Sequence, residues 1–139
     1  VVKKISKMTG LPVVMLDARS WCCRLVSRFG FKISYHGGPG IFLNLMKNAE
    51  LVLTTSLHGT IFSSIFEKSF WFIDSSMHNE DDDRAIFLLD QLGLTYRYIH
   101  CNRILDIDLF KKPNYEVVRE NVSILREVSI KYLQSSIND

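Results

Sequence analysis

The chain has 139 residues, of which 47% are apolar, and its 17 basic and 15 acidic residues leave a net charge of +2. This length suits one domain, and the apolar content is enough for a buried core. The charges are well mixed and form no basic face, so nucleic acid is not an expected partner. No apolar run is long enough to span a bilayer. The three cysteines lack the spacing of a zinc site, which favours free thiols in a reducing, cytoplasmic compartment.

The first third of the chain alternates between helical and extended patterns. The predicted elements are a helix tail ending at Gly10, a strand over 11–16, a helix over 20–30, a strand over 31–35, a glycine-rich turn over 36–40 and a short helix over 41–48. Gly10 suits a helix end because glycine adopts a left-handed backbone without strain. Since the chain starts in the tail of a helix and not at Met, we expect it to be a fragment of a longer protein.

The alternation continues to the end of the chain. The predicted elements are a strand over 50–55, a helix over 57–66, a strand over 69–73 that closes at Asp74, a polar stretch over 75–84, a helix over 85–92, a strand over 96–99 and a long amphipathic helix from Tyr115. Strands that alternate with helices of this length predict an α/β fold with a mostly parallel sheet flanked by helices. We expect one such domain over residues 1–139.

Polar residues gather where the predicted strands end. They are Asp17 with Arg19, His36 with its glycines, the 56–59 turn, the 74–84 stretch and the 100–103 segment. Because right-handed crossovers place every strand-to-helix turn on the same rim of a parallel sheet, we expect these residues along one edge.

The sharpest of these turns is Ser56-Leu57-His58-Gly59, where the strand period changes to a helical one. The first N–H groups of a helix lack backbone partners and carry the positive end of its dipole, which makes an anion site. Ser56 is a suitable N-cap, Gly59 leaves room for a ligand to approach the backbone, and His58 adds a titratable group. The alternative is a capped turn whose histidine is merely solvated.

Other polar residues have competing interpretations. Arg84 could clamp a phosphate or carboxylate at two points, or it could balance Asp81–Asp83. That acidic run, even with His78 nearby, matches no metal-binding spacing and is interpreted as a solvated loop. The turn over 36–40 lacks the spacing of a nucleotide motif and favours a structural role. His100 and Cys101 are interpreted as a buried or partly buried structural pair.

The order of motifs resembles that of a known family. The relevant stretches are GPGIFLNLMKNAELVLTTSLHGTIFSSIFEKSFWFID, an arginine before FLLDQLGL, and YRYI. Together they resemble the C-terminal part of the polysaccharide pyruvyl transferase family over about residues 38–99. The most specific element is the run from Ser56 to Thr60.

The resemblance implies a Rossmann-like domain that forms the C-terminal half of a GT-B type enzyme. Such enzymes transfer pyruvate from phosphoenolpyruvate to a sugar of a cell-surface polysaccharide, so the implied partners are this donor, a saccharide acceptor that can be lipid-linked, and the missing N-terminal half. No cofactor and no metal are implied, and the enzyme would be cytoplasmic or peripheral to the inner face of the membrane. The residues carried over are His58 as general acid or base, and Ser56, Leu57, Gly59, Thr60 and Arg84 as substrate contacts.

Two other functions stay open at this point. A GT-B nucleotide-sugar glycosyltransferase would share the fold, with Glu67 or Asp74 on the ribose, but no clear basic pair for a diphosphate is present. A non-catalytic α/β interaction domain is the other alternative, although Asp17 lacks the lysine that a receiver domain would place after its last strand. The fold alone does not decide among these functions.

Overall fold

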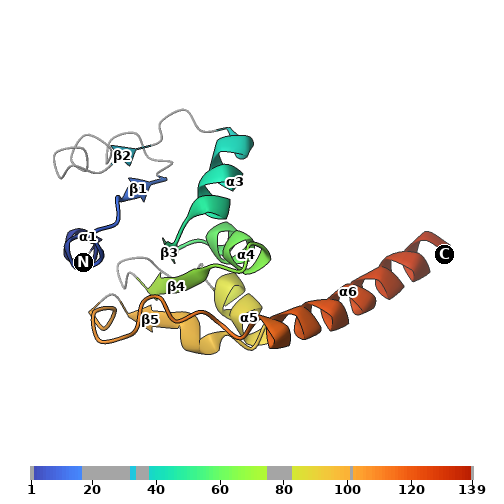
Figure 1. Ribbon diagram of the computed structural model, residues 1–139. Helices are drawn as coiled ribbons and strands as arrows, with labels where there is room; N and C mark the ends of the chain where they lie inside the picture. Colours follow the sequence, from blue (N-terminus) through green and yellow to red (C-terminus); the bar gives the residue numbers. More distant parts are fainter. Residues whose placement is uncertain (1, 17–31, 34–37, 75–82, 101, 139) are drawn as a thin grey trace.

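The structure is a computed structural model that describes residues 2–16, 32–33, 38–74, 83–100 and 102–138. Its elements in chain order are α1 (Val2–Thr9), β1 (Val14–Met15), β2 (Lys32–Ile33), α3 (Pro39–Asn48), β3 (Leu51–Thr54), α4 (Leu57–Ile65), β4 (Ser69–Asp74), α5 (Asp83–Gln91), a 3₁₀ turn (Thr95–Arg97), β5 (Tyr98–His100) and α6 (Tyr115–Asn138) (Figure 1). The helix predicted over 20–30 lies outside the described residues.

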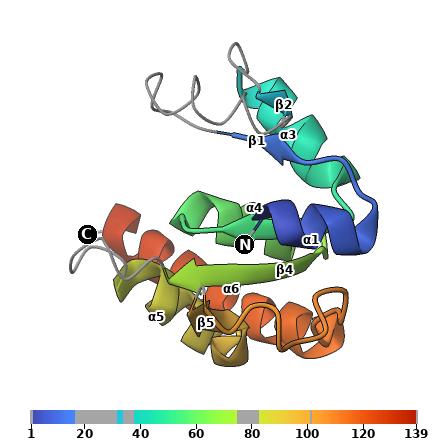
Figure 2. The ribbon, with the colours of Figure 1, turned by 90° about the vertical axis from the view of Figure 1, so that its left-hand side faces the viewer.

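The strands form parallel sheets, as the alternation of elements predicts. β4 lies between β3 and β5 in a three-stranded sheet, and β1 pairs with β2 in a separate two-stranded one. The two sheets lie apart in both ribbon views (Figures 1 and 2). The α/β fold with a parallel, helix-flanked sheet is therefore confirmed. The polar residues predicted after the first two strands, Asp17, Arg19 and His36, lie outside the described residues. In the described ranges β1 and β2 do not pair with β3–β5.

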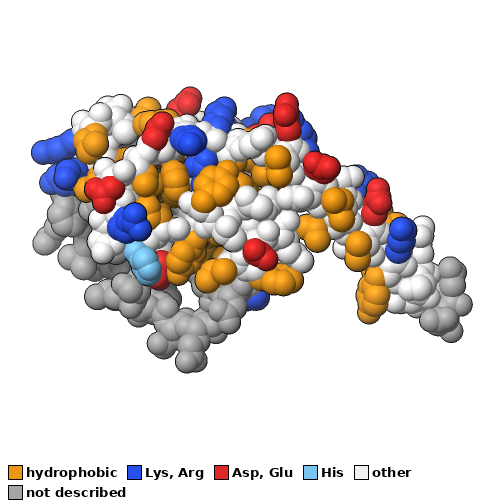
Figure 3. Space-filling view, turned by 90° about the horizontal axis from the view of Figure 1, so that it is seen from below, with side chains coloured by type: hydrophobic (Ala, Val, Ile, Leu, Met, Phe, Trp, Pro, Cys, Tyr) orange, Lys and Arg blue, Asp and Glu red, His pale blue; other side chains and the backbone are white. Residues whose placement is uncertain are grey.

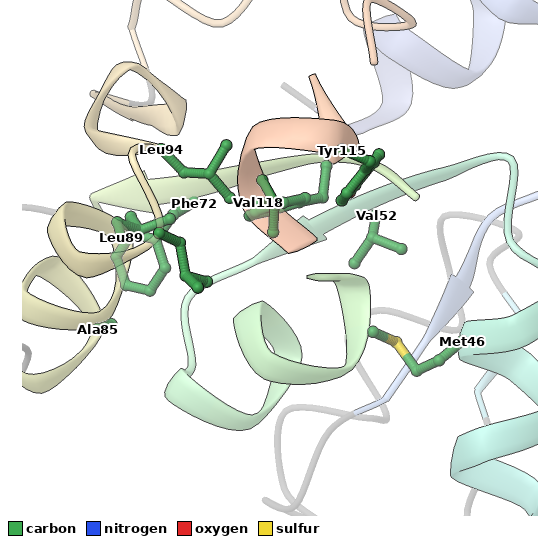
Figure 4. Close-up of a cluster of buried hydrophobic side chains, with 10 residues drawn as sticks. Met46, Val52, Phe72, Ala85, Leu89, Leu94, Tyr115 and Val118 are labelled. Atoms are coloured by element: carbon green, nitrogen blue, oxygen red, sulfur yellow. The ribbon is translucent and has the colours of Figure 1, made fainter. Parts of the chain in front are cut away.

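One face of the three-stranded sheet carries the larger core. Val52, Phe70 and Phe72 point to this face, and helices α3, α4, α5 and α6 pack over it. Figure 4 shows Tyr115 and Val118 of α6 reaching toward these strands. Since side chains alternate between the two faces of a strand, every second residue of β3 and β4 joins this core.

The opposite face is covered by α1 and by the segment 102–112. Trp71 and Ile73 of β4 pack there against Ile5, Ile104 and Leu109. The segment is also tied to β4 by hydrogen bonds, because the Ser69 hydroxyl and the Trp71 indole N–H donate to the Leu109 carbonyl at 2.9 and 3.1 Å. A strand that is buried on both faces explains the unbroken apolar run of β4.

The predicted ends of the first helix and of the helix over 85–92 agree with the structure to within one residue, whereas two strands begin later than predicted. The strand predicted over 11–16 begins at Val14. Gly10 and Gly93 both have φ of +70° and follow α1 and α5, as expected of helix-ending glycines. The strand predicted over 96–99 starts two residues later, at Tyr98. Tyr96 and Arg97 belong instead to the 3₁₀ turn, in which Arg97 is fully buried with its guanidinium 4.5 Å from the centre of the Trp71 ring.

Tyr115 anchors the long helix α6 to the rest of the fold. Its hydroxyl donates to the Lys68 carbonyl at 2.5 Å, and its ring lies in the larger core. Beyond Leu125, which also packs against that core, α6 projects from the body and carries exposed apolar side chains between charged ones (Figures 1 and 3). No helix in the described ranges has both the length and the apolar character needed to cross a bilayer.

Burial raises the pKa of Tyr115 above its ordinary value, so stability should fall in alkali. Above about pH 10 the unfolded chain releases the phenolic proton while the folded chain keeps it, which costs up to about 1.4 kcal/mol per pH unit. We expect urea unfolding to show this decline between pH 9.5 and 11, and Tyr115→Phe to make it shallower. An equally steep decline in Tyr115→Phe would contradict the assignment of the effect to this residue.

Candidate functional site

The turn between β3 and α4 is built by side chains that satisfy its backbone. The Ser56 hydroxyl accepts a hydrogen bond from the Gly59 N–H at 3.1 Å and caps the helix. The Thr54 hydroxyl in turn accepts one from the Ser56 N–H at 3.1 Å. The prediction that Ser56 is the N-cap is therefore confirmed, and the cap itself is held by the last residue of the strand.

Gly59 is needed for packing in this turn. A Cβ atom added to Gly59 would lie 2.0 Å from the Thr54 Oγ1 atom and 2.7 Å from the Thr54 Cβ atom, closer than real contacts allow. The glycine is buried, and it lets the first turn of α4 approach β3. The interpretation that Gly59 leaves room for a ligand is therefore wrong. The space that a side chain at position 59 would need is filled by Thr54.

Thr60 and Leu57 also support the turn from inside. Thr60 is fully buried, and both its hydroxyl and its N–H donate to the Ser56 carbonyl, at 3.2 and 3.1 Å. The Leu57 side chain packs against the larger core. A ligand could therefore contact only the backbone groups of these two residues, and the Thr60 N–H is already hydrogen-bonded to the Ser56 carbonyl.

His58 is the member of the motif with an exposed side chain in the first turn of α4. The N–H groups of Leu57 and His58 precede the first intrahelical bond, which Thr60 donates to Ser56. They lie at the positive end of the helix dipole, beside the exposed His58 side chain. This combination can hold an anion and move a proton beside it.

The ends of β4 and β5 lie on the same edge of the sheet as this turn. In the register of the sheet, Thr54 pairs with Phe72, and Asp74 pairs with His100. Thr54, Asp74 and His100 each follow by two residues a side chain of the larger core, so they belong to the face that α4 and α5 cover. For these three strands the predicted gathering of polar residues along one edge is confirmed.

The side chains of Asp74 and His100 contact each other at this edge. The His100 Nδ1 atom lies 2.9 Å from the Asp74 Oδ2 atom, and the His100 side chain is 60% exposed. His100 is therefore exposed, so the interpretation of it as buried or partly buried is wrong, while Cys101 lies outside the described residues. The sequence alone could place both residues at the edge but could not pair them, because strand order is not visible in it.

Arg84 lies in the first turn of α5 and is exposed. α5 packs beside α4 over the same face of the sheet, so the two helix starts belong to one side of the fold. The segment 75–82 before it, which contains His78 and most of the acidic run, lies outside the described residues, as does His36. Within the described part of the chain, no three histidine, cysteine or acidic side chains come together as a metal site.

Glu67, one of the residues considered for a ribose, lies at the other end of α4. It follows the C-terminus of the helix and forms an ion pair with Arg119 of α6. It is therefore separated from Ser56 and His58 by the length of α4. Asp74 remains at the edge, but it is engaged with His100.

The family model of polysaccharide pyruvyl transferase matches residues 5–77, more than half of the chain. The match begins well before residue 38, where the resemblance in motifs starts, and it includes the whole of β3, the capped turn, α4 and β4. No curated protein and no solved structure matches the chain. Because the match covers over half of the chain and includes the candidate site, the chain belongs to the polysaccharide pyruvyl transferase family.

Proposed function

We propose that this chain binds phosphoenolpyruvate for an enzyme that transfers pyruvate to a sugar of a cell-surface polysaccharide. The observation that carries the proposal is the position of the capped turn inside the family match, with an exposed histidine at a helix N-terminus. The rest of the saccharide-binding surface would come from a second, N-terminal half of a GT-B type enzyme. The chain would then be the C-terminal half, as one Rossmann-like domain.

The donor carries two anionic groups, a phosphate and a carboxylate, and the turn suits one of them. The free N–H groups of Leu57 and His58 would hold this anion, with the Ser56 hydroxyl beside it. Arg84 would bind the second anionic group through its planar guanidinium. His58 would then lie beside the enol and could give its proton to the methylene carbon.

A nucleotide-sugar donor would need different residues. Glu67 is engaged with Arg119 away from the turn, and Asp74 is paired with His100. Neither carboxylate is therefore free to bind a ribose without losing a partner. These contacts favour phosphoenolpyruvate over a nucleotide sugar, and no cofactor is part of the proposal.

The proposal is tested by NMR titration of ¹⁵N-labelled chain with phosphoenolpyruvate, and separately with UDP-galactose. We expect phosphoenolpyruvate to shift the amide signals of Ser56–Thr60, because its anion would bind the N–H groups of Leu57 and His58 within this turn. His58→Ala should weaken this binding by about tenfold, the effect of losing one charge-assisted hydrogen bond.

Ile65→Ala is the matched control, since Ile65 is exposed at the far end of the same helix. It should bind phosphoenolpyruvate as the wild-type chain does. Shifts with UDP-galactose alone would favour the glycosyltransferase. Equal binding by the wild-type chain and His58→Ala would remove His58 from the donor site.

A further inference from the structure

We propose that His100, oriented by Asp74, is a second proton-transfer residue at this edge and acts on the acceptor hydroxyl. The inference rests on the proposed function and adds a residue that lies outside the family match, which ends at residue 77. Three observations support it. They are the face of the sheet on which His100 lies, the contacts that hold its ring, and the separation of His58 and His100 across the sheet.

The face of the sheet brings His100 to the donor site. His100 follows Tyr98, which packs against the core beneath α4 and α5. Asp74 follows Phe72 of the same core, and its contact with His100 keeps both side chains on that face. The contact between Asp74 and His100 therefore lies where the first turns of α4 and α5 begin, and not on the face covered by α1.

Two contacts hold the imidazole ring. The Asp74 carboxylate lies 2.9 Å from the Nδ1 atom and favours a proton on that nitrogen. The Tyr98 ring meets the imidazole edge to face, with ring centres 6.1 Å apart, and is itself stacked on Phe72. No bond from the Nε2 atom of His100 is present in the part of the chain that the structure describes. A histidine with Nδ1 held by a carboxylate and Nε2 open has the arrangement of a general base.

The strand order leaves room for a small donor between His58 and His100. His58 follows β3 and His100 ends β5, with β4 between them. Neighbouring strands are about 4.8 Å apart, so the ends of β3 and β5 are about 10 Å apart. A small donor bound at the turn would thus have His58 on one side and His100 on the other. One residue can give a proton to the donor while the other takes one from the acceptor.

In the proposed reaction, the acceptor hydroxyl adds to phosphoenolpyruvate and phosphate leaves. The acceptor hydroxyl gives its proton to the Nε2 atom of His100, and its oxygen bonds to the central carbon of phosphoenolpyruvate. The electron pair of the carbon–carbon double bond takes a proton from His58 at the methylene carbon, which becomes a methyl group. Phosphate then leaves with the electron pair of its carbon–oxygen bond, and a second hydroxyl of the same sugar bonds to the central carbon to close the ketal. This hydroxyl gives its proton to His58, and His100 passes the proton that it took to the departing phosphate. Asp74 stabilises the imidazolium that forms on His100 and is a positioning residue.

The alternative is an exposed ion pair with no role, since such pairs are common and contribute little to stability. Carbethoxylation by diethyl pyrocarbonate, mapped by mass spectrometry of peptides, distinguishes the two because it modifies open imidazole nitrogens one residue at a time. We expect saturating phosphoenolpyruvate to slow the modification of both His58 and His100 several-fold. Protection of His58 without protection of His100 would overturn this inference and leave the donor site intact. Protection of neither residue would overturn the proposed function.

Two variants test the proton-transfer role. ¹⁵N NMR of the imidazoles should show the His100 proton on Nδ1, and Asp74→Asn should shift this population toward Nε2. In phosphate release from phosphoenolpyruvate by the enzyme assembled with its N-terminal half, with methyl glycosides as acceptors, His100→Gln should lower turnover by about 10²-fold or more, while the Kd for the donor stays within about twofold. Unchanged turnover in His100→Gln, or an unchanged tautomer in Asp74→Asn, would contradict the role.

Discussion

Gly59→Ala is expected to destabilise the protein and to abolish donor binding together. The added Cβ atom would meet the Thr54 hydroxyl at 2.0 Å and the Thr54 Cβ atom at 2.7 Å, so β3 and α4 must move apart. Overpacking of this kind costs about 1–3 kcal/mol of unfolding free energy, and more where backbone resists the shift. The same shift would pull the Ser56 cap away from the Gly59 N–H. Urea unfolding and phosphoenolpyruvate titration measure the two effects.

Gly40→Ala is the control for this prediction. Gly40 also lies in the first turn of a helix, α3, but no atom lies within 4 Å of the place where its Cβ would be. Alanine there should leave stability unchanged or raise it by up to about 1 kcal/mol, because alanine favours helix. If the two variants were equally stable, the close approach of α4 to β3 would not be the reason for a glycine at position 59.

Phe72→Ala is expected to cause the largest loss of stability in the core. Phe72 is 1% exposed, lies on the central strand, and stacks on Tyr98 with ring centres 5.6 Å apart. Truncating a buried phenylalanine costs about 3–5 kcal/mol through lost burial and the cavity left behind. This is a large share of the stability of an ordinary domain, about 5–15 kcal/mol. We therefore expect a substantial unfolded fraction, measured by circular dichroism in urea.

Phe87→Ala removes the same side chain from an exposed position. Phe87 is 63% exposed on α5, so its truncation should change the unfolding free energy by no more than about 0.5 kcal/mol. Phe72→Leu should fall between the two because it keeps most of the buried volume. A loss in Phe87→Ala as large as that in Phe72→Ala would mean that α5 buries a different face.

Local signals were enough to predict the turn and the order of the elements. The hydroxyl of Ser56 was recognised as a cap because serine before an apolar helical period satisfies a backbone N–H that the helix leaves open. Gly10 predicts the end of the first helix for a similar local reason. Such features depend on residues close in sequence, which is why they could be read without the fold.

Features that depend on distant residues could not be predicted. The pairing of Asp74 with His100 needs β4 beside β5, and the need for Gly59 becomes visible only when α4 lies against Thr54. The burial of Arg97 has the same origin, since Trp71 reaches its guanidinium from a neighbouring strand. Each of these contacts is made by tertiary packing, which overrides local preference.

The packing of Thr54 against Gly59 has a consequence for how this protein can evolve. The residues that shape the turn are also residues that hold β3 and α4 together, so a substitution there changes folding before it changes specificity. Natural variation is constrained most where a single position serves two requirements. We expect new substrate preferences to arise at exposed positions outside the turn, while the turn itself stays the same.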